Sequence, residues 1–157
     1  MPSPDFVLSL RERIGHELIW MSGVTALVLD TPGRRVLSVR RADTGVWTPV
    51  TGIIDPGEQP ARAAVREVAE EAGIRARPRH LIEVRTLPEM TYPNGDRAQY
   101  LDLTFVLEHE EGEPHPADGE NTEARWLPWD ETPPWNDRFL RVLRRALAGE
   151  TVAEFQA

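Results

Sequence analysis

The sequence predicts a single α/β domain, and three observations support this fold class. The chain has 157 residues, which is the usual size of one domain. Residues 60–73 carry apolar side chains at three- and four-residue spacing, as expected of a helix with one buried face. Apolar runs at 24–29 and 36–39 flank a turn at 30–33 and predict paired strands. Helical and extended patterns therefore share a chain long enough to form one core.

The other elements follow from local signals along the chain. Ser3-Pro4 resembles an N-cap and a first-turn proline, and the apolar spacing that follows predicts a short helix over 4–15. Pro60 and Gly73 mark the ends of the central helix. A closing helix is expected over about 133–148, with its apolar side packed on the sheet and its arginines largely on the other face. Strands are expected at 16–20, 24–29, 36–39, 79–86, 99–107 and 124–127.

Composition excludes several classes of function. The chain has no cysteine, which excludes disulfides, thiolate catalysis and cysteine-based zinc sites. Its 18 basic residues are all arginine, so a phosphate clamp must come from guanidinium groups. The net charge of −8 argues against DNA and RNA as partners. There is no apolar run long enough to span a membrane and no signal-peptide pattern, so the cytoplasm is the expected location. Residues 108–123, rich in acidic side chains, are expected to form a solvated loop.

Three glutamates on the central helix carry the strongest chemical signal. Glu67, Glu70 and Glu71 fall at i, i+3 and i+4, which places their carboxylates side by side. Like charges so close repel one another, unless a divalent cation binds between them. Mg²⁺ prefers hard oxygen ligands and is commonly shared with the phosphates of a substrate. The alternative is a solvated acidic face balanced by nearby arginines.

These residues belong to a longer pattern that resembles the Nudix family. Residues 52–74 reproduce the Nudix box, G-x5-E-x7-R-E-U-x-E-E-x-G-U with U aliphatic, at every specified position. The resemblance implies a Nudix α/β/α sandwich, in which helices cover a mixed β-sheet across the single domain 1–157. It also implies a hydrolase of pyrophosphate bonds in nucleoside diphosphate derivatives such as ADP-ribose, dinucleoside polyphosphates or nucleoside triphosphates.

The resemblance also implies a role for each candidate site residue. Mg²⁺, or Mn²⁺ in its place, would be the cofactor. Glu67 or Glu120 would take a proton from the attacking water, and Arg66 would act with them from the same box. Glu58 would pair with Arg66 and, together with Gly52, orient the loop before the helix. The implied metal ligands are Glu67, Glu70, Glu71, Glu120 and the backbone carbonyl of Thr51.

The substrate and the partners stay open at this stage. A small nucleotide is the expected partner, and Trp47 and Tyr92 are candidates for stacking on its base, although Trp47 also suits a core position. The exposed N-terminal helix would allow a homodimer. One alternative is a noncatalytic nucleotide-sensing or interaction module on the same fold. Another is a pyrophosphohydrolase of RNA 5′ ends, which would need a basic surface groove.

Overall fold

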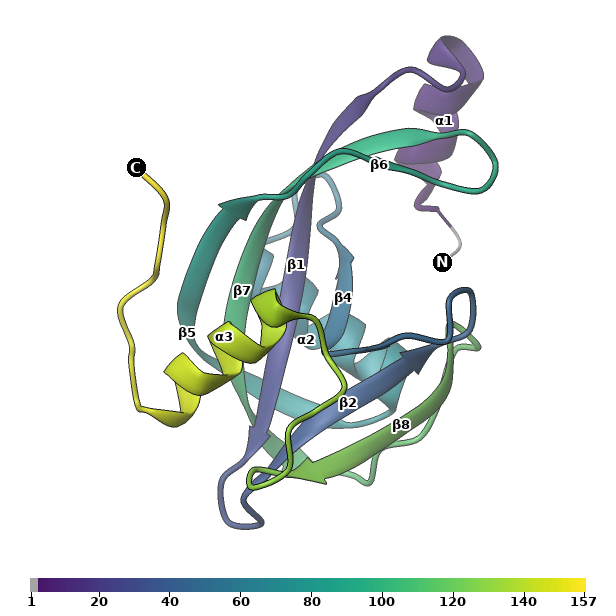
Figure 1. The fold of residues 1–157 in the computed structure, drawn as a ribbon. Helices are drawn as coiled ribbons and strands as arrows, with labels where there is room; N and C mark the ends of the chain where they lie inside the picture. Colours follow the sequence, from purple (N-terminus) through teal and green to yellow (C-terminus); the bar gives the residue numbers. More distant parts are fainter. Residues whose placement is uncertain (1–2) are drawn as a thin grey trace.

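The computed structural model describes residues 3–157, so residues 1 and 2 of the predicted domain lie outside the described part. Eight strands form one mixed sheet, with α2 behind it and α3 in front of it in Figure 1. This arrangement confirms the predicted α/β class with helices on both faces of the sheet. The elements are α1 (Asp5–Ile14), β1 (Ile19–Asp30), β2 (Arg35–Arg41), β3 (Trp47–Thr48), β4 (Val50–Ile53), α2 (Pro60–Ala72), β5 (Arg75–Thr86), β6 (Met90–Thr91), β7 (Arg97–Glu111), β8 (Asn121–Pro128) and α3 (Asp137–Leu147).

The parallel pair β1 and β7 forms the centre of the sheet, from Ile19 opposite Ala98 to Leu29 opposite Glu108. β5 pairs antiparallel with the far edge of β7. On its other edge, β1 pairs with β4 along its middle and with β2 only at its C-terminal end. β8 and β3 then flank β2, and the β2–β8 ribbon extends to one side of the sheet centre (Figure 1). The residues that lead into α2 therefore lie directly beside the central strand.

Several strands are longer than their sequence patterns predicted. The segments 16–20 and 24–29 were predicted as two strands, but β1 is continuous because β7 pairs with it along almost its whole length. β7 likewise continues to Glu111, where Arg75 at the start of β5 forms a 3.0 Å ion pair with it. The prediction of a solvated loop from residue 108 was therefore wrong for its first four residues. Cross-strand pairing with arginines overrides the local charge pattern there.

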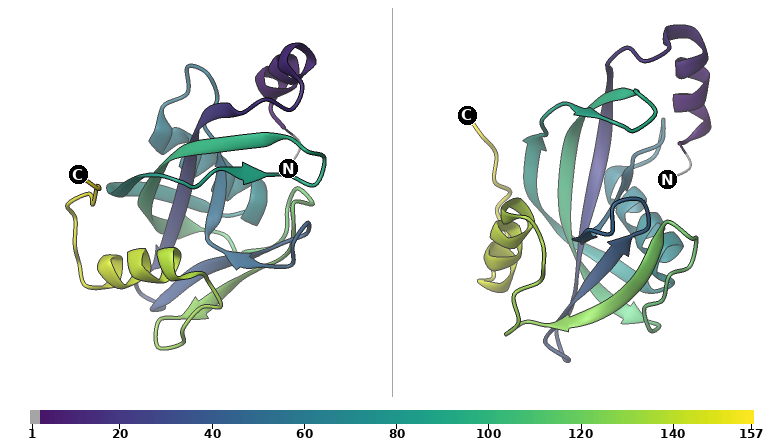
Figure 2. Two further views of the ribbon diagram at one scale, coloured as in Figure 1. Left: turned by 45° about the horizontal axis from the view of Figure 1, so that its top comes forward. Right: turned by 45° about the vertical axis from the view of Figure 1, so that its right-hand side comes forward.

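Three hydrophobic clusters fix the helices on the sheet. The first joins the apolar face of α2 to the sheet through side chains such as Val68, Val28 and Leu107. The second lies on the opposite face, where Phe139 and Val142 of α3 pack on β5 and β7. A smaller cluster contains Val7 of α1. The two views in Figure 2 show α1 apart from the other helices, beside the β6–β7 hairpin.

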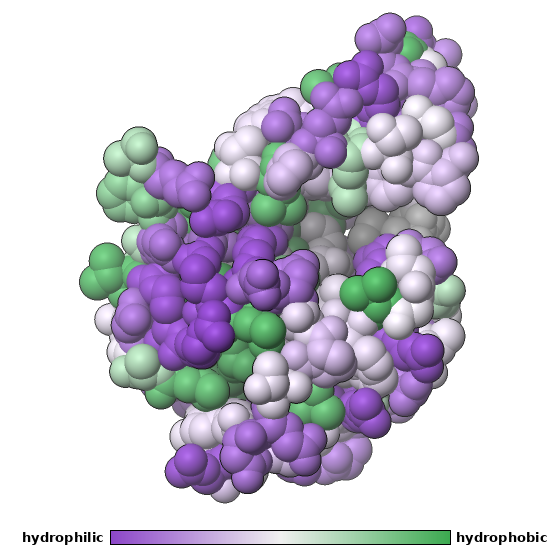
Figure 3. Space-filling view, viewed as in Figure 1, coloured by the Kyte–Doolittle hydropathy of each residue, from purple (hydrophilic) through white to green (hydrophobic). Residues whose placement is uncertain are grey.

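The closing helix begins later than the predicted position near 133. Its first residue is Asp137, because the Asn136 side chain accepts a hydrogen bond from the Phe139 N–H at 3.0 Å and caps the helix there. Its arginines do not all face solvent. Arg138 donates to the buried carboxylates of Glu83 and Asp102, and hydrophilic side chains dominate the surface above this helix (Figure 3). No helix in residues 3–157 combines the length and the apolar character needed to cross a membrane.

Candidate active site

The turn that leads into α2 is held by bonds between its own residues. The Glu58 N–H donates to the Asp55 carbonyl at 2.9 Å, and the Asp55 N–H donates back to the Glu58 carboxylate at 3.2 Å. Gly57 takes φ +85° in this turn, a conformation that favours glycine. The helix then starts at Pro60 and ends at Gly73, which lies in the left-handed region, as the sequence predicted.

Arg66 connects this turn to the helix. Its guanidinium donates two hydrogen bonds to Glu58, at 2.9 and 2.8 Å, and one to the Ile53 carbonyl at 3.1 Å. The third nitrogen, Nη1, donates to Glu67 at 2.9 Å and to Glu70 at 3.0 Å. The hydrogen bond to Arg66 lowers the pKa of Glu58 despite its partial burial. The predicted Arg66–Glu58 pair is therefore present and ties the turn to α2.

Glu67 lies against the backbone of β4. Its carboxyl group is so close to Gly52 that a Cβ on Gly52 would lie 2.1 Å from the carboxyl carbon. Any other residue at position 52 would have to displace this carboxylate, so Gly52 is required by space rather than by its backbone angles. Glu67 is 7% exposed, and burial raises its pKa to about 7 against the lowering effect of Arg66. The carbonyl of Thr51 belongs to the residue immediately before this contact.

Glu71 is the most deeply buried glutamate of the box. It is 3% exposed, and its Oε2 accepts a 2.7 Å hydrogen bond from the side-chain amide of Asn121. Its other oxygen, Oε1, is buried and finds no hydrogen-bond donor anywhere in residues 3–157. Burial raises the pKa of Glu71 to about 8. A buried carboxylate oxygen without a donor is costly, and such an atom suits a cation that the structure does not contain.

A cavity of about 180 Å³ lies beside Glu67 and Glu70 of α2. Burial raises the pKa of Glu120, one of its lining residues, although this side chain is only half-buried. Glu70 is 52% exposed at its side chain and extends to the outer rim. The structure thus brings Glu67, Glu70 and Glu120 to one cavity, with Glu71 one turn further along the helix than Glu67. The lining residues are Pro4, Ile53, Asp55, Arg66, Glu67, Glu70 and Glu120.

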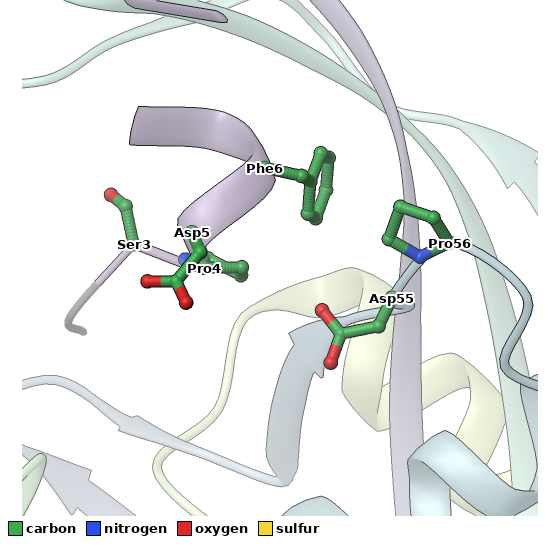
Figure 4. Close-up of a pocket in the computed structure, with 6 residues that line it drawn as sticks. All are labelled: Ser3, Pro4, Asp5, Phe6, Asp55 and Pro56. Atoms are coloured by element: carbon green, nitrogen blue, oxygen red, sulfur yellow. The ribbon is translucent and has the colours of Figure 1, made fainter. Parts of the chain in front are cut away.

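A larger hollow of about 500 Å³ adjoins this cavity and shares Pro4 and Asp55 with it. Figure 4 shows it between the start of α1, with Phe6, and the loop that follows β4, with Pro56. The box glutamates do not line it. Two of the box glutamates and Arg66 gather at the smaller cavity, and the larger hollow adds space beside it.

The acidic segment after β7 is anchored to α2 rather than solvated throughout. The His115 N–H donates to the Ala72 carbonyl at 3.1 Å, and the Ala117 N–H donates to the Glu71 carbonyl at 3.3 Å. The imidazole of His115 occupies the space beside Gly73, where a Cβ would lie 2.2 Å from it. These bonds satisfy carbonyls at the C-terminal end of the helix and place the following residues beside the box.

Two residues at the site were not predicted from the sequence, namely Asn121 and His115. Asn121 contacts a side chain fifty positions away, and His115 packs on Gly73 across the end of a helix. No local spacing signals either contact, since both depend on how the segment after β7 returns to α2. The prediction that Glu120 approaches the box relied on family resemblance, and the structure places it in the cavity.

The oxygen-rich donor set fits a hard divalent cation, although the ligands are not yet gathered around one point. Within the described part of the chain, no three His, Asp or Glu side chains lie close enough together to hold a metal. Arg66 takes up one oxygen each of Glu67 and Glu70 through its Nη1, at 2.9 and 3.0 Å. The free buried oxygen of Glu71 and the closeness of Glu67 to the β4 backbone are the features that fit Mg²⁺.

The two aromatic candidates for base stacking lie in different surroundings. Trp47 packs at the edge of the α3-side core, and the Arg125 guanidinium covers its ring at 4.3 Å from the centroid. Tyr92 is 37% exposed after β6, and its hydroxyl lies 2.8 Å from the hydroxyl of Tyr100. A base could stack on Trp47 only at the face that Arg125 leaves, whereas Tyr92 is accessible as it stands.

Comparison with known proteins identifies the class that this fold and these carboxylates define. A family model of the NUDIX domain matches residues 20–146, which is most of the chain. The chain belongs to the Nudix family. It is similar to the solved structure of a NUDIX hydrolase from Nitrosomonas europaea, with a TM-score of 0.66 and 22% identity, covering 88% of this chain and 97% of that one.

Curated relatives are similar over the same region. A protein named Nudix hydrolase 6 from Arabidopsis thaliana is 32% identical over 123 residues, covering 74% of this chain and 42% of the relative. A protein named NAD-capped RNA hydrolase NudC from Pseudomonas aeruginosa is 34% identical over 110 residues, covering 69% of this chain and 37% of the relative. The chain therefore matches less than half the length of each of these relatives.

Proposed function

We propose that this protein hydrolyses a pyrophosphate bond in a small nucleoside diphosphate derivative and needs a divalent metal ion for it. The observation that carries this proposal is the pair of buried box glutamates. Glu67 and Glu71 are held in a low-exposure site, where burial raises both pKa values, and the free oxygen of Glu71 has no donor among the described residues. A chain gains nothing in stability from such groups unless a cation joins them.

Mg²⁺ or Mn²⁺ would be held by Glu67, Glu70 and Glu71, with the Thr51 carbonyl and Glu120 as further oxygen ligands. When bound, the metal would neutralise charge on the phosphoryl oxygens and lower the pKa of a bound water. A cation would compete with Arg66 Nη1, which now bonds one oxygen of Glu67 and one of Glu70 at 2.9 and 3.0 Å. Arg66 itself would keep the turn in place through Glu58.

The chemical step is the attack of a water oxygen on one phosphorus atom of the anhydride. The bond from that phosphorus to the bridging oxygen breaks, and the bridging oxygen leaves on the second phosphate. A carboxylate takes the proton of the water, and Glu67 and Glu120 are the two candidates because both line the cavity of about 180 Å³. Both have raised pKa values, and a base with a pKa nearer neutrality can also release its proton readily.

A small nucleotide is favoured over a polynucleotide. The net charge of −8 and the acidic lining of the cavity oppose a long phosphate backbone, since each uncompensated phosphate would meet like charge. The relative from Pseudomonas aeruginosa carries a name that refers to capped RNA, so RNA ends are the second candidate substrate. Because of the net negative charge, RNA binding by this chain would be weak.

The experiment is a release assay on a panel of substrates. It includes ADP-ribose, NADH, diadenosine polyphosphates, nucleotide sugars, nucleoside triphosphates and an NAD-capped RNA, each with Mg²⁺, Mn²⁺ or EDTA. Metal-dependent release from a small nucleotide is the expected result. Tight binding without product across the panel would refute the enzyme and favour a nucleotide-sensing module. Faster release from capped RNA than from any small nucleotide would overturn the substrate class.

A further inference from the structure

Asn121 is a buried amide side chain that contacts a carboxylate of the Nudix box. It is 4% exposed at the first position of β8, and it donates a 2.7 Å hydrogen bond to Glu71 of α2. Pattern and spacing gave no reason to place this residue at the site. The contact joins the segment after β7 to the most buried carboxylate of the box.

An irregularity in the β2–β8 pairing directs this side chain toward α2. Along β8, Ala124 packs in the core beneath α2, and Glu123 faces the other way and forms an ion pair with Arg40 at 3.1 Å. Regular alternation would put Asn121 on the same face as Glu123. The register instead shifts between Arg40 and Arg41, so that Arg41 pairs with Asn121 and Thr122 is skipped. Such a bulge turns the Asn121 side chain to the α2 face.

The segment before Asn121 is fixed independently of this bulge. Backbone hydrogen bonds from His115 and Ala117 hold it to the end of α2, at 3.1 and 3.3 Å. The His115 ring packs where Gly73 leaves room for it. The backbone of Asn121 is therefore fixed by its pairing with β2 and by the anchored segment that precedes it. Its side chain can hold Glu71 in one orientation.

An uncharged amide is suited to hold a carboxylate that binds a metal. Arg66 neutralises the carboxylates that it holds, but an amide donates a hydrogen bond without bringing a charge. The amide therefore fixes Oε2 of Glu71 without adding a positive charge that would compete with a cation. Its Oε1 is buried and accepts no hydrogen bond from the described residues, so it stays available for the metal.

We infer that Asn121 is a positioning residue, whose amide fixes Glu71 Oε2 so that Oε1 is free to bind the divalent cation. This inference rests on the proposed function, since it concerns the same metal site. Partners of this kind, which hold a metal ligand in place, change metal affinity or activity by about 10- to 100-fold when they are removed.

The test measures Mn²⁺ binding to the nucleotide-free protein by electron paramagnetic resonance, alongside turnover as a function of Mn²⁺ concentration. Asn121→Leu removes the amide at similar volume. We expect its dissociation constant for Mn²⁺ to rise about tenfold or more, and the half-saturating Mn²⁺ concentration for turnover to rise in parallel. Saturating Mn²⁺ should restore much of the turnover. Loss of folded protein alone would lower turnover without moving this midpoint.

Two further variants make the result specific. Thr122→Val changes the neighbouring residue, whose hydroxyl donates to the Arg40 carbonyl at 3.3 Å, and it should bind Mn²⁺ as the wild type does. Asn121→Ala removes the amide without placing an apolar branch against the carboxylate, so it gives the same test if the leucine variant does not fold. Thermal unfolding in EDTA reports the folding of each variant.

The outcomes separate this inference from the proposed function. Wild-type affinity for Mn²⁺ in both Asn121 variants would overturn the positioning role while the metal site stands. Wild-type protein that binds no Mn²⁺ and hydrolyses nothing would refute the proposed function itself. Weaker binding in both Asn121 variants but not in Thr122→Val would support the inference.

Discussion

Replacing Glu71 with glutamine should separate the chemical role of this residue from its cost to the fold. Glutamine has nearly the same shape, and its oxygen can still accept the hydrogen bond that Asn121 now donates to Oε2 at 2.7 Å. The variant loses the negative charge that a cation needs, so metal-dependent turnover should fall by about 100-fold or more. The free energy of unfolding of the metal-free variant, in contrast, should exceed that of the wild type at alkaline pH.

The magnitude follows from the raised pKa of the buried carboxyl. Burial raises the pKa of Glu71 from 4.5 to about 8, so the folded metal-free protein holds this proton more tightly than the unfolded chain does. Between these two values the folded state binds more protons, and stability therefore falls as the pH rises toward 8. From pH 5.5 to pH 8.5 the wild type should lose about 3 kcal/mol through this group, a loss that the glutamine variant escapes.

The assay is denaturant unfolding in EDTA at pH 5.5 and pH 8.5 for both proteins. The two should be similar in stability at pH 5.5, where Glu71 of the wild type is largely protonated. At pH 8.5 the variant should be the more stable, by a difference equivalent to roughly 6–12 °C in midpoint temperature. Equal pH dependence in the two proteins would show that Glu71 ionises normally, and the argument from its burial would then be wrong.

Three other substitutions test further contacts. Gly52→Ala places a methyl group where the Glu67 carboxylate lies, so metal affinity measured by Mn²⁺ titration should fall at least about tenfold; unchanged affinity would contradict the close approach. Arg66→Gln leaves the buried Glu67 without its cation and should cost about 1–3 kcal/mol in denaturant unfolding, a range reduced because Arg66 is 30% exposed. Arg138→Met removes the arginine that pairs with buried Asp102 and one of the three arginines that pair with buried Glu83, and it should cost about 3 kcal/mol while the metal midpoint of turnover stays the same; a shifted midpoint would refute a purely structural role.

Local patterns in the sequence predicted the fold class and the central helix correctly. Pro60 and Gly73 bound α2, and the helix and strand patterns on either side predicted the layered sheet. The helix does bury an apolar face, as its spacing predicted, but the buried face also includes Glu67 and Glu71. A hydrophobic pattern cannot reveal carboxylates that are buried for binding, since their burial opposes the stability that such patterns report.

The parts that could not be predicted depend on contacts between distant segments. The strand β1 appears as two pieces in the sequence, because its continuity comes from pairing with β7. The orientation of Asn121 depends on a register shift against β2, and register shifts leave no periodic signal. The buried ion pairs of Arg138 likewise join α3 to β5 and β7. Helical spacing alone had assigned that arginine to the outer face.

The most direct test of the proposed reaction compares wild type and Glu71→Gln on the best substrate of the panel, at saturating Mg²⁺ and in EDTA. The measured quantity is the rate of release of the two phosphorylated products. We predict rapid release by the wild type with Mg²⁺ and no release in EDTA. In the variant, the rate with Mg²⁺ should be lower than that of the wild type by about 100-fold or more. Release by the wild type that persists in EDTA, or an unchanged rate in the variant at saturating Mg²⁺, would contradict metal-dependent hydrolysis at these glutamates.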